Sequence, residues 1–284
     1  MVASPRQKPL DKQEVCRKVT ALLKKTYSGT APKRELPVLE TLLYAICLEN
    51  ATPAQADAVY ARLLNAFHDL NEIRVSSITE LLPVFVDVDD GNWRALRIKA
   101  SLQHVFETNY SFDFESLKRK TLELAVKQLG KVPSLSAFVR SFVLQHCLGS
   151  HILPIDARMH AALVWLHLAE PGSTPEQAAE ALRSHVRKAD AEQFCHLIHC
   201  LATDPKRMRA FAAGHSKASA ETEDPAARLA RLLQRGDAAP PAAARGSKRP
   251  PAKPARKAPA KTSRPAARPA PRPAKGKTAS KKKH

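Results

Sequence analysis

The sequence has few aromatic residues, few glycines and no long hydrophobic run. Aromatic side chains make up 5% of its 284 residues, and there are nine glycines. A membrane-spanning helix needs about 20 consecutive apolar residues, and a signal peptide needs an apolar segment near the N-terminus. Neither pattern occurs, so we expect a soluble intracellular protein with no membrane partner. Its length suits one large domain or two small ones.

The cysteines are odd in number, scattered, and mostly placed within apolar helical patterns. A disulfide framework is typical of short secreted chains with paired cysteines. We therefore expect reduced thiols in a cytosolic protein. The five cysteines are Cys16, Cys47, Cys147, Cys195 and Cys200.

The C-terminal segment 238–284 contains no acidic residue and no Leu, Ile, Val, Met or aromatic residue. It holds fifteen Lys and Arg, so it carries +15 of the formal net charge of +19. Without apolar side chains it cannot offset the entropy lost on ordering, and its many prolines favour extended conformations. The segment therefore predicts a disordered basic tail.

A flexible polycation binds nucleic acid by releasing condensed counterions. A solubilising role or binding to an acidic membrane face are the alternatives, but no amphipathic or lipidated anchor accompanies the tail. We therefore expect the tail to bind duplex DNA. Its expected DNA contacts include Lys248, Arg249, Lys253, Arg256, Lys257 and Lys261.

Apolar residues recur with helical spacing from about residue 10 to residue 214, which predicts an all-α protein. We expect an N-terminal extension with one helix (1–30), a helical domain (31–214) and a linker with a weak short-helix signal (215–237). Within the domain we expect a uniformly apolar, buried helix at about 37–49, a helix from 53, and others at 76–84, 92–108, 113–129, 134–148, 156–169, 174–188 and 189–202. Thr52–Pro53 and Thr174–Pro175 each place a capping residue before a first-turn proline, which predicts helix starts there. The only strand candidate is VFVDVDD, residues 84–90.

The stretch HILPIDARMHAAL places a single carboxylate, Asp156, between an apolar run (152–155) and an amphipathic helix. An aspartate in this position commonly caps a helix by accepting hydrogen bonds from its first turn. The same position also suits a reactive carboxylate at the edge of a pocket. Composition alone leaves both interpretations open.

Three segments, in this order, resemble the helix-hairpin-helix DNA glycosylase superfamily of the endonuclease III type. They are Glu49–Leu63, Leu96–Phe106 and Val132–Asp156, and the resemblance spans roughly residues 30–205. It implies a helix-hairpin-helix DNA glycosylase-like bundle, followed here by the basic tail. It also implies base-excision repair as the activity and duplex DNA as the partner.

The resemblance gives Asp156 a catalytic role. The family's aspartate lies beside the pocket for a flipped base, where it can stabilise positive charge on the sugar or activate the nucleophile. Asn50 takes the place of a polar residue that fills the gap left by that base, although it could equally cap a turn. Arg158 and His160 are expected phosphate contacts, with ordinary surface polarity as the alternative.

The chain departs from the family in the hairpin, residues 132–136 (VPSLS). Two family glycines are replaced by Ser134 and Ser136, which keeps small residues but loses easy access to positive φ. Weaker phosphate binding is expected, with these serines and Arg140 as the DNA contacts. Phe138 takes the place of the lysine that forms a Schiff base in bifunctional members, so lyase activity by that route should be absent.

The four cysteines that hold an iron–sulfur cluster in close relatives of endonuclease III are also missing. Cys195 and Cys200 supply only two thiolates. His196 and His199 lie between them on one expected helix, which can present two ligands at most on one side. We therefore expect no metal and no cofactor.

Three functions remain open. The first is a DNA-binding protein of the base-excision-repair glycosylase type, at most a monofunctional N-glycosylase without lyase activity. The second is a catalytically inactive DNA-binding or nucleoid-associated relative, and the third is an architectural protein whose helical domain binds partners. We expect a monomer, located in the cytoplasm with the nucleoid in a bacterium or in the nucleus of a eukaryote.

Overall fold

The computed structural model describes residues 11–27, 31–211 and 224–237. The chain divides into two units after Ala239, and the described residues all belong to the first. They form α-helices, 3-10 helices and turns, with no strand among them, so the prediction of an all-α protein is confirmed. The basic tail, 238–284, lies outside the described residues. No helix in the described ranges is long and apolar enough to cross a membrane.

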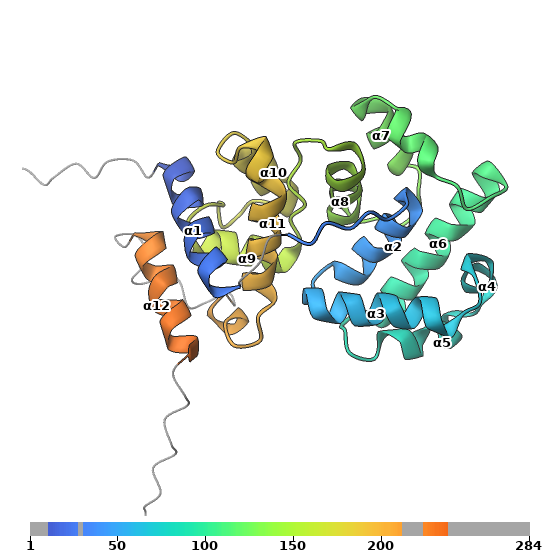
Figure 1. The fold of residues 1–284 in the computed structure, drawn as a ribbon, viewed down its shortest axis with the longest axis horizontal. Helices are drawn as coiled ribbons and strands as arrows, with labels where there is room; N and C mark the ends of the chain where they lie inside the picture. The colour runs from blue at the N-terminus through green and yellow to red at the C-terminus, as the bar shows by residue number, and fades with distance from the viewer. Residues whose placement is uncertain (1–10, 28–30, 212–223, 238–284) are drawn as a thin grey trace, which may run out of the picture. The chain divides into compact units, whose positions relative to one another are not determined.

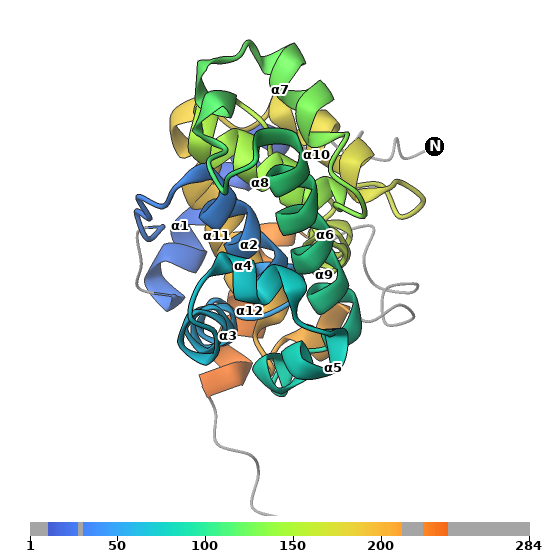
Figure 2. The same cartoon turned by 90° about the vertical axis from the view of Figure 1, so that its right-hand side faces the viewer.

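The first group of helices is built around α2 (Val38–Leu48), in which nearly every residue is buried. It packs against α3 (Pro53–Ala66), α6 (Gly91–Asn109) and α8 (Ala137–Leu148), as Figures 1 and 2 show. An apolar helix buried on most sides is what the uniformly hydrophobic segment 37–49 predicts. The remaining elements of this group are α4 (Leu70–Val75), α5 (Ile78–Leu81), α7 (Leu122–Leu129) and the 3-10 helices η1 (Leu82–Phe85) and η2 (Glu115–Arg119).

The second group joins the N-terminal helix α1 (Lys12–Thr26) to elements from the C-terminal half. α1 packs against α11 (Lys188–Thr203) and α12 (Pro225–Asp237), and α11 packs against α9 (Ala157–Trp165) (Figure 1). The apolar side of α1 is buried in these contacts. The other elements here are α10 (Pro175–Arg183) and η3 (Met208–Phe211).

Two helix starts follow the cap-then-proline signal. The Thr52 hydroxyl accepts a hydrogen bond from the Gln55 N–H at 3.1 Å, and the Thr174 hydroxyl accepts one from the Gln177 N–H at 3.2 Å. Each glutamine side chain in turn accepts from the backbone N–H of its threonine. Both are complete capping boxes, and they begin α3 and α10 as expected.

The prediction of a single helix at 113–129 is wrong, because this segment forms two separate elements, η2 and α7. Thr121 is extended, and its hydroxyl accepts a hydrogen bond from the Leu124 N–H at 3.5 Å, so it caps a new helix. The helix expected at 156–169 ends at Trp165, before His167 takes a left-handed φ of 57°. The one expected at 174–188 ends at Arg183.

The strand candidate 84–90 is also wrong. Val84 and Phe85 are buried in η1, and residues 86–90 form turns. The helix expected at 76–84 covers only α5 before it tightens into η1, where Pro83 has no N–H to continue α-helical bonding. The sequence pattern did not indicate the short helix α4.

Candidate functional site at Asp156

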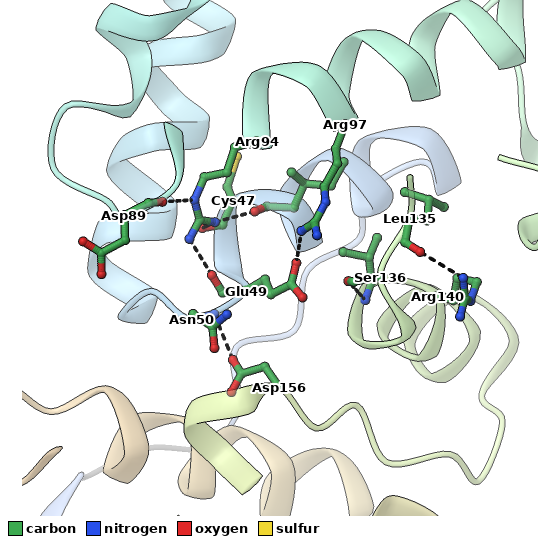
Figure 3. Close-up of polar contacts among 12 residues, drawn as sticks. Cys47, Glu49, Asn50, Asp89, Arg94, Arg97, Leu135, Ser136, Arg140 and Asp156 are labelled. Carbon is green, nitrogen blue, oxygen red and sulfur yellow. Dashed lines mark hydrogen bonds and ion pairs between the residues drawn. The ribbon is translucent and has the colours of Figure 1, made fainter. Parts of the chain in front are cut away.

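Asp156 is the N-cap of α9, and its carboxylate is buried. Oδ1 accepts a hydrogen bond from the Met159 N–H at 2.8 Å, and Oδ2 accepts one from the Asn50 N–H at 2.9 Å. The residue is 2% exposed. The cap interpretation is therefore confirmed, and the carboxylate also joins α9 to the end of α2 (Figure 3). Its catalytic role stays a prediction.

His199, on α11, is the buried neighbour of this carboxylate. Its Nε2 lies 3.5 Å from Asp156 Oδ2, and the residue is 4% exposed. Burial alone would raise the pKa of Asp156, but His199 and the N–H groups of Met159 and Asn50 together lower it below the usual value. Asp156 is therefore ionised at neutral pH.

Phe138, on α8, packs against this histidine. The Phe138 and His199 rings are nearly parallel, at 20°, with their centroids 6.2 Å apart. The position at which the resemblance expects a lysine in bifunctional glycosylases thus holds a buried aromatic ring beside the Asp156–His199 pair. The sequence indicated His199 only as a possible metal ligand, and no local pattern signals its approach to Asp156.

Asn50 and Arg158 lie at the same helix start. Asn50 adopts a left-handed φ of 55°, and its Oδ1 accepts a hydrogen bond from the Arg158 N–H at 3.3 Å. The Arg158 guanidinium forms an ion pair with Asp89 at 2.7 Å. The structure therefore brings Asn50, Asp156 and Arg158 together, with the Asn50 side chain used to cap α9.

A cavity of about 230 Å³ opens beside these residues. Its lining includes Asn50, Asp89 and Arg158, and it does not include Asp156. His160, the other expected phosphate contact, instead lies 3.1 Å from the Ser173 hydroxyl. Because the Asp156 side chain has no exposed surface, a substrate could reach it only if the residues that cover it moved.

The two hairpin serines, Ser134 and Ser136, have different structural roles. Ser134 is exposed and adopts a left-handed φ of 61°, so the serine takes the conformation that favours glycine. Ser136 is the N-cap of α8, and its hydroxyl accepts a hydrogen bond from the Val139 N–H at 3.2 Å. Arg140 donates to the Leu135 carbonyl at 2.9 Å, which ties α8 to the hairpin backbone (Figure 3).

Opposite effects on stability are expected at these serines. Ser134→Gly should raise the free energy of unfolding by up to about 1 kcal/mol, because glycine adopts positive φ without steric cost. Ser136→Ala should lower it by about 1 kcal/mol, because the cap of α8 is lost. Urea denaturation of both variants measures the difference. Equal changes would contradict the assignment of strain to Ser134 and capping to Ser136.

Glu49 lies between the hairpin and α6. Its carboxylate pairs with the Arg97 guanidinium at 2.6 Å, and its side chain is 13% exposed. Burial raises the pKa of Glu49, while the Arg97 charge and a hydrogen bond from Ser136 oppose that rise. No motif in the sequence singles out Glu49 as a site residue. Its hydrogen bond with Ser136 links the end of α2 to the hairpin, and Figure 3 shows its pairing with Arg97.

Arg94 fixes the backbone that leads to Asn50. It is 4% exposed, and its guanidinium donates to four backbone carbonyls. The acceptors are Ile46 O at 2.5 Å, Cys47 O at 3.1 Å, Glu49 O at 2.6 Å and Asp89 O at 2.9 Å. The last carbonyls of a helix lack partners within it, so Arg94 satisfies the end of α2 and holds the turn that presents Asn50.

Cys200 and His196 lie close together on α11. Cys200 Sγ lies 3.6 Å from His196 Nε2, and no group of three or more potential ligands occurs within those ranges. Burial raises the pKa of Cys195 to about 12 and that of Cys200 to about 11, so both are neutral thiols. The six expected contacts in the tail, from Lys248 to Lys261, lie outside the described residues.

Comparison with known proteins assigns the fold. No protein-family model matches the sequence, and no curated protein matches it. Solved structures do match, and the protein has the all-α fold of the helix-hairpin-helix DNA glycosylases.

Three structures represent these matches. A non-covalent endonuclease III–DNA complex is 16% identical, with a TM-score of 0.53 over 80% of this chain and 98% of that one. A thermostable thymine-DNA glycosylase is 14% identical, with a TM-score of 0.50 over 72% and 94%. The 3-methyladenine DNA glycosylase of H. pylori bound to 1,N6-ethenoadenine is 16% identical, with a TM-score of 0.50 over 67% and 95%. At these identities the similarity concerns the fold.

Proposed function

We propose that the protein binds duplex DNA as a member of the base-excision-repair glycosylase type and is at most a monofunctional N-glycosylase. The observation that carries this proposal is the meeting of Asn50, Asp156 and Arg158 at the start of α9, within a fold shared with endonuclease III bound to DNA. The location that follows is the nucleoid of a bacterium or the nucleus of a eukaryote.

Lyase chemistry through a lysine is not part of the proposal. Phe138 has no nucleophile, and its ring is buried against His199. If hydrolysis takes place, the ionised Asp156 carboxylate is the group that would stabilise positive charge developing on the sugar.

A catalytically inactive DNA-binding relative is the second candidate, and one observation favours it. Both oxygens of Asp156 already accept backbone hydrogen bonds, and the side chain has no exposed surface. A carboxylate used in this way stabilises the protein without touching a substrate. DNA binding is common to both candidates, whereas base release separates them.

The test measures binding and base release by the full chain. We expect tight duplex binding at low salt that weakens as salt rises, and a flatter salt dependence when residues 238–284 are removed. A panel of duplexes with single damaged or mismatched bases then tests for free base. Release of a base would establish the glycosylase; binding without release would favour the inactive relative. No binding by the full chain would contradict both.

A further inference from the structure

A groove of about 490 Å³ lies between α1 and the N-terminal end of α11, away from Asp156. We call it the α1 groove; Arg17, Thr20 and Lys24 of α1 line one side and Arg187 lies on the other. Arg187 precedes His199 by twelve residues, which is about 18 Å along the helix axis. The groove is therefore separate from the site already described.

The lining of the α1 groove keeps a net positive charge when its one ion pair is counted as neutral. Its only acidic lining residue is Asp190, which pairs with Arg187 at 2.6 Å. Arg17 and Lys24 are exposed and have no hydrogen-bond or ion-pair partner among residues 11–27, 31–211 and 224–237. Two unpaired cations thus face the groove.

The spacing of these cations favours a polymer over a small ion. Arg17 and Lys24 are seven residues apart on one face of α1, about 10 Å along the helix axis. Duplex DNA carries one negative charge per about 1.7 Å of its axis, so the two side chains can contact different phosphates. A groove of this volume also exceeds what one phosphate group would fill.

We propose that the α1 groove is a second contact surface for the phosphate backbone of a nucleic acid, formed by Arg17 and Lys24. It would hold a stretch of DNA that does not reach the site at Asp156. The choice of DNA as the polymer rests on the proposed function. The contact carries no sequence information, since cations read phosphate and not base edges.

The same helix supplies a matched control. Lys18 and Lys25 are also exposed and also seven residues apart, but they do not line the groove. Lys18 instead pairs with Glu14 at 3.0 Å. The double variants Arg17→Gln/Lys24→Gln and Lys18→Gln/Lys25→Gln therefore remove the same charge, with the same spacing, from two faces of one helix.

The experiment measures the affinity of both full-length variants for a short labelled duplex over a range of salt concentrations. Loss of two phosphate contacts should reduce the slope of log affinity against log salt by about 1.8 in the groove variant. The control variant should keep a slope close to that of the wild type. Thermal unfolding should change little in both, because all four positions are on the surface and the Lys18–Glu14 pair is largely exposed.

Two results would overturn the inference. Equal slopes in the two variants would show that only total charge matters. Weaker binding of the groove variant to phosphatidylserine vesicles, with unchanged binding to DNA, would assign the groove to a membrane surface. Failure of the wild-type chain to bind any duplex is a different outcome, because it would contradict the proposed function itself.

Discussion

Replacement of Asp156 by asparagine is expected to lower the free energy of unfolding by about 3 kcal/mol. The carboxylate accepts from two buried N–H groups, those of Met159 and Asn50. An amide has one oxygen, so its NH₂ group would face one of these donors. His199 would also lose the negative charge 3.5 Å from its Nε2. Urea denaturation at neutral pH measures the loss.

The effect of Asp156→Asn should depend on pH in a defined direction. The pKa of Asp156 is lowered in the folded protein, so its ionised form contributes stability above the pKa of an unfolded aspartate, about 3.9. That contribution disappears as the pH falls through the folded pKa. The difference between wild type and variant should therefore shrink as the pH falls below about pH 4.

Asp11 is the matched control for this variant. It caps α1 by accepting hydrogen bonds from the Gln13 and Glu14 N–H groups at 3.0 and 3.4 Å, but it is exposed. Asparagine caps a helix about as well as aspartate, so Asp11→Asn should change stability by less than about 0.5 kcal/mol. A similar small change at Asp156 would mean that its carboxylate is not committed to the fold. It would then be free for catalysis.

Local signals in the sequence predicted the parts of the fold that depend on neighbouring residues. The capping box at Thr52 joins residues three apart, and Asp156 likewise caps an N–H three residues later. Such bonds depend on residue type and spacing within one turn. At 113–129 the apolar pattern predicted one continuous helix, but the cap at Thr121 begins a new one.

The rest of the site depends on contacts between distant residues. The hydrogen bond from Asn50 to Asp156 spans 106 residues, and only the family resemblance placed the two together. Neither the sequence nor the resemblance predicted that His199 lies beside Asp156 or that the Arg94 guanidinium binds the end of α2. A buried histidine or arginine within a helix gives no sign of its partner, because its direction is set by the packing of several helices.

Arg94→Ala is expected to lower the free energy of unfolding by about 4 kcal/mol. Its guanidinium supplies hydrogen bonds to carbonyls of Ile46, Cys47, Glu49 and Asp89. Alanine would leave these acceptors without a donor and would create a void beside α2. Denaturation by urea gives the loss, provided that the variant folds. If Arg94→Ala does not fold, Arg94→Lys is measured instead. A lysine keeps the charge but cannot reproduce the planar guanidinium that donates to several carbonyls.

The large loss of stability in Arg94→Ala should come from the burial of the Arg94 hydrogen bonds, because an exposed arginine contributes little. Arg183 on α10 provides the comparison, because it pairs with Glu180 at 2.8 Å and both side chains are largely exposed. Arg183→Ala should cost less than about 0.5 kcal/mol. Equal losses at the two positions would contradict the role of Arg94 at the end of α2.

If Arg94→Lys folds with an intermediate loss, its effect should reach Asn50, because the carbonyls held by Arg94 include that of Glu49, the residue directly before Asn50. Weaker protection of the Asn50 N–H from hydrogen exchange, with no change at Thr174, would trace the effect from α2 to the carboxylate of Asp156.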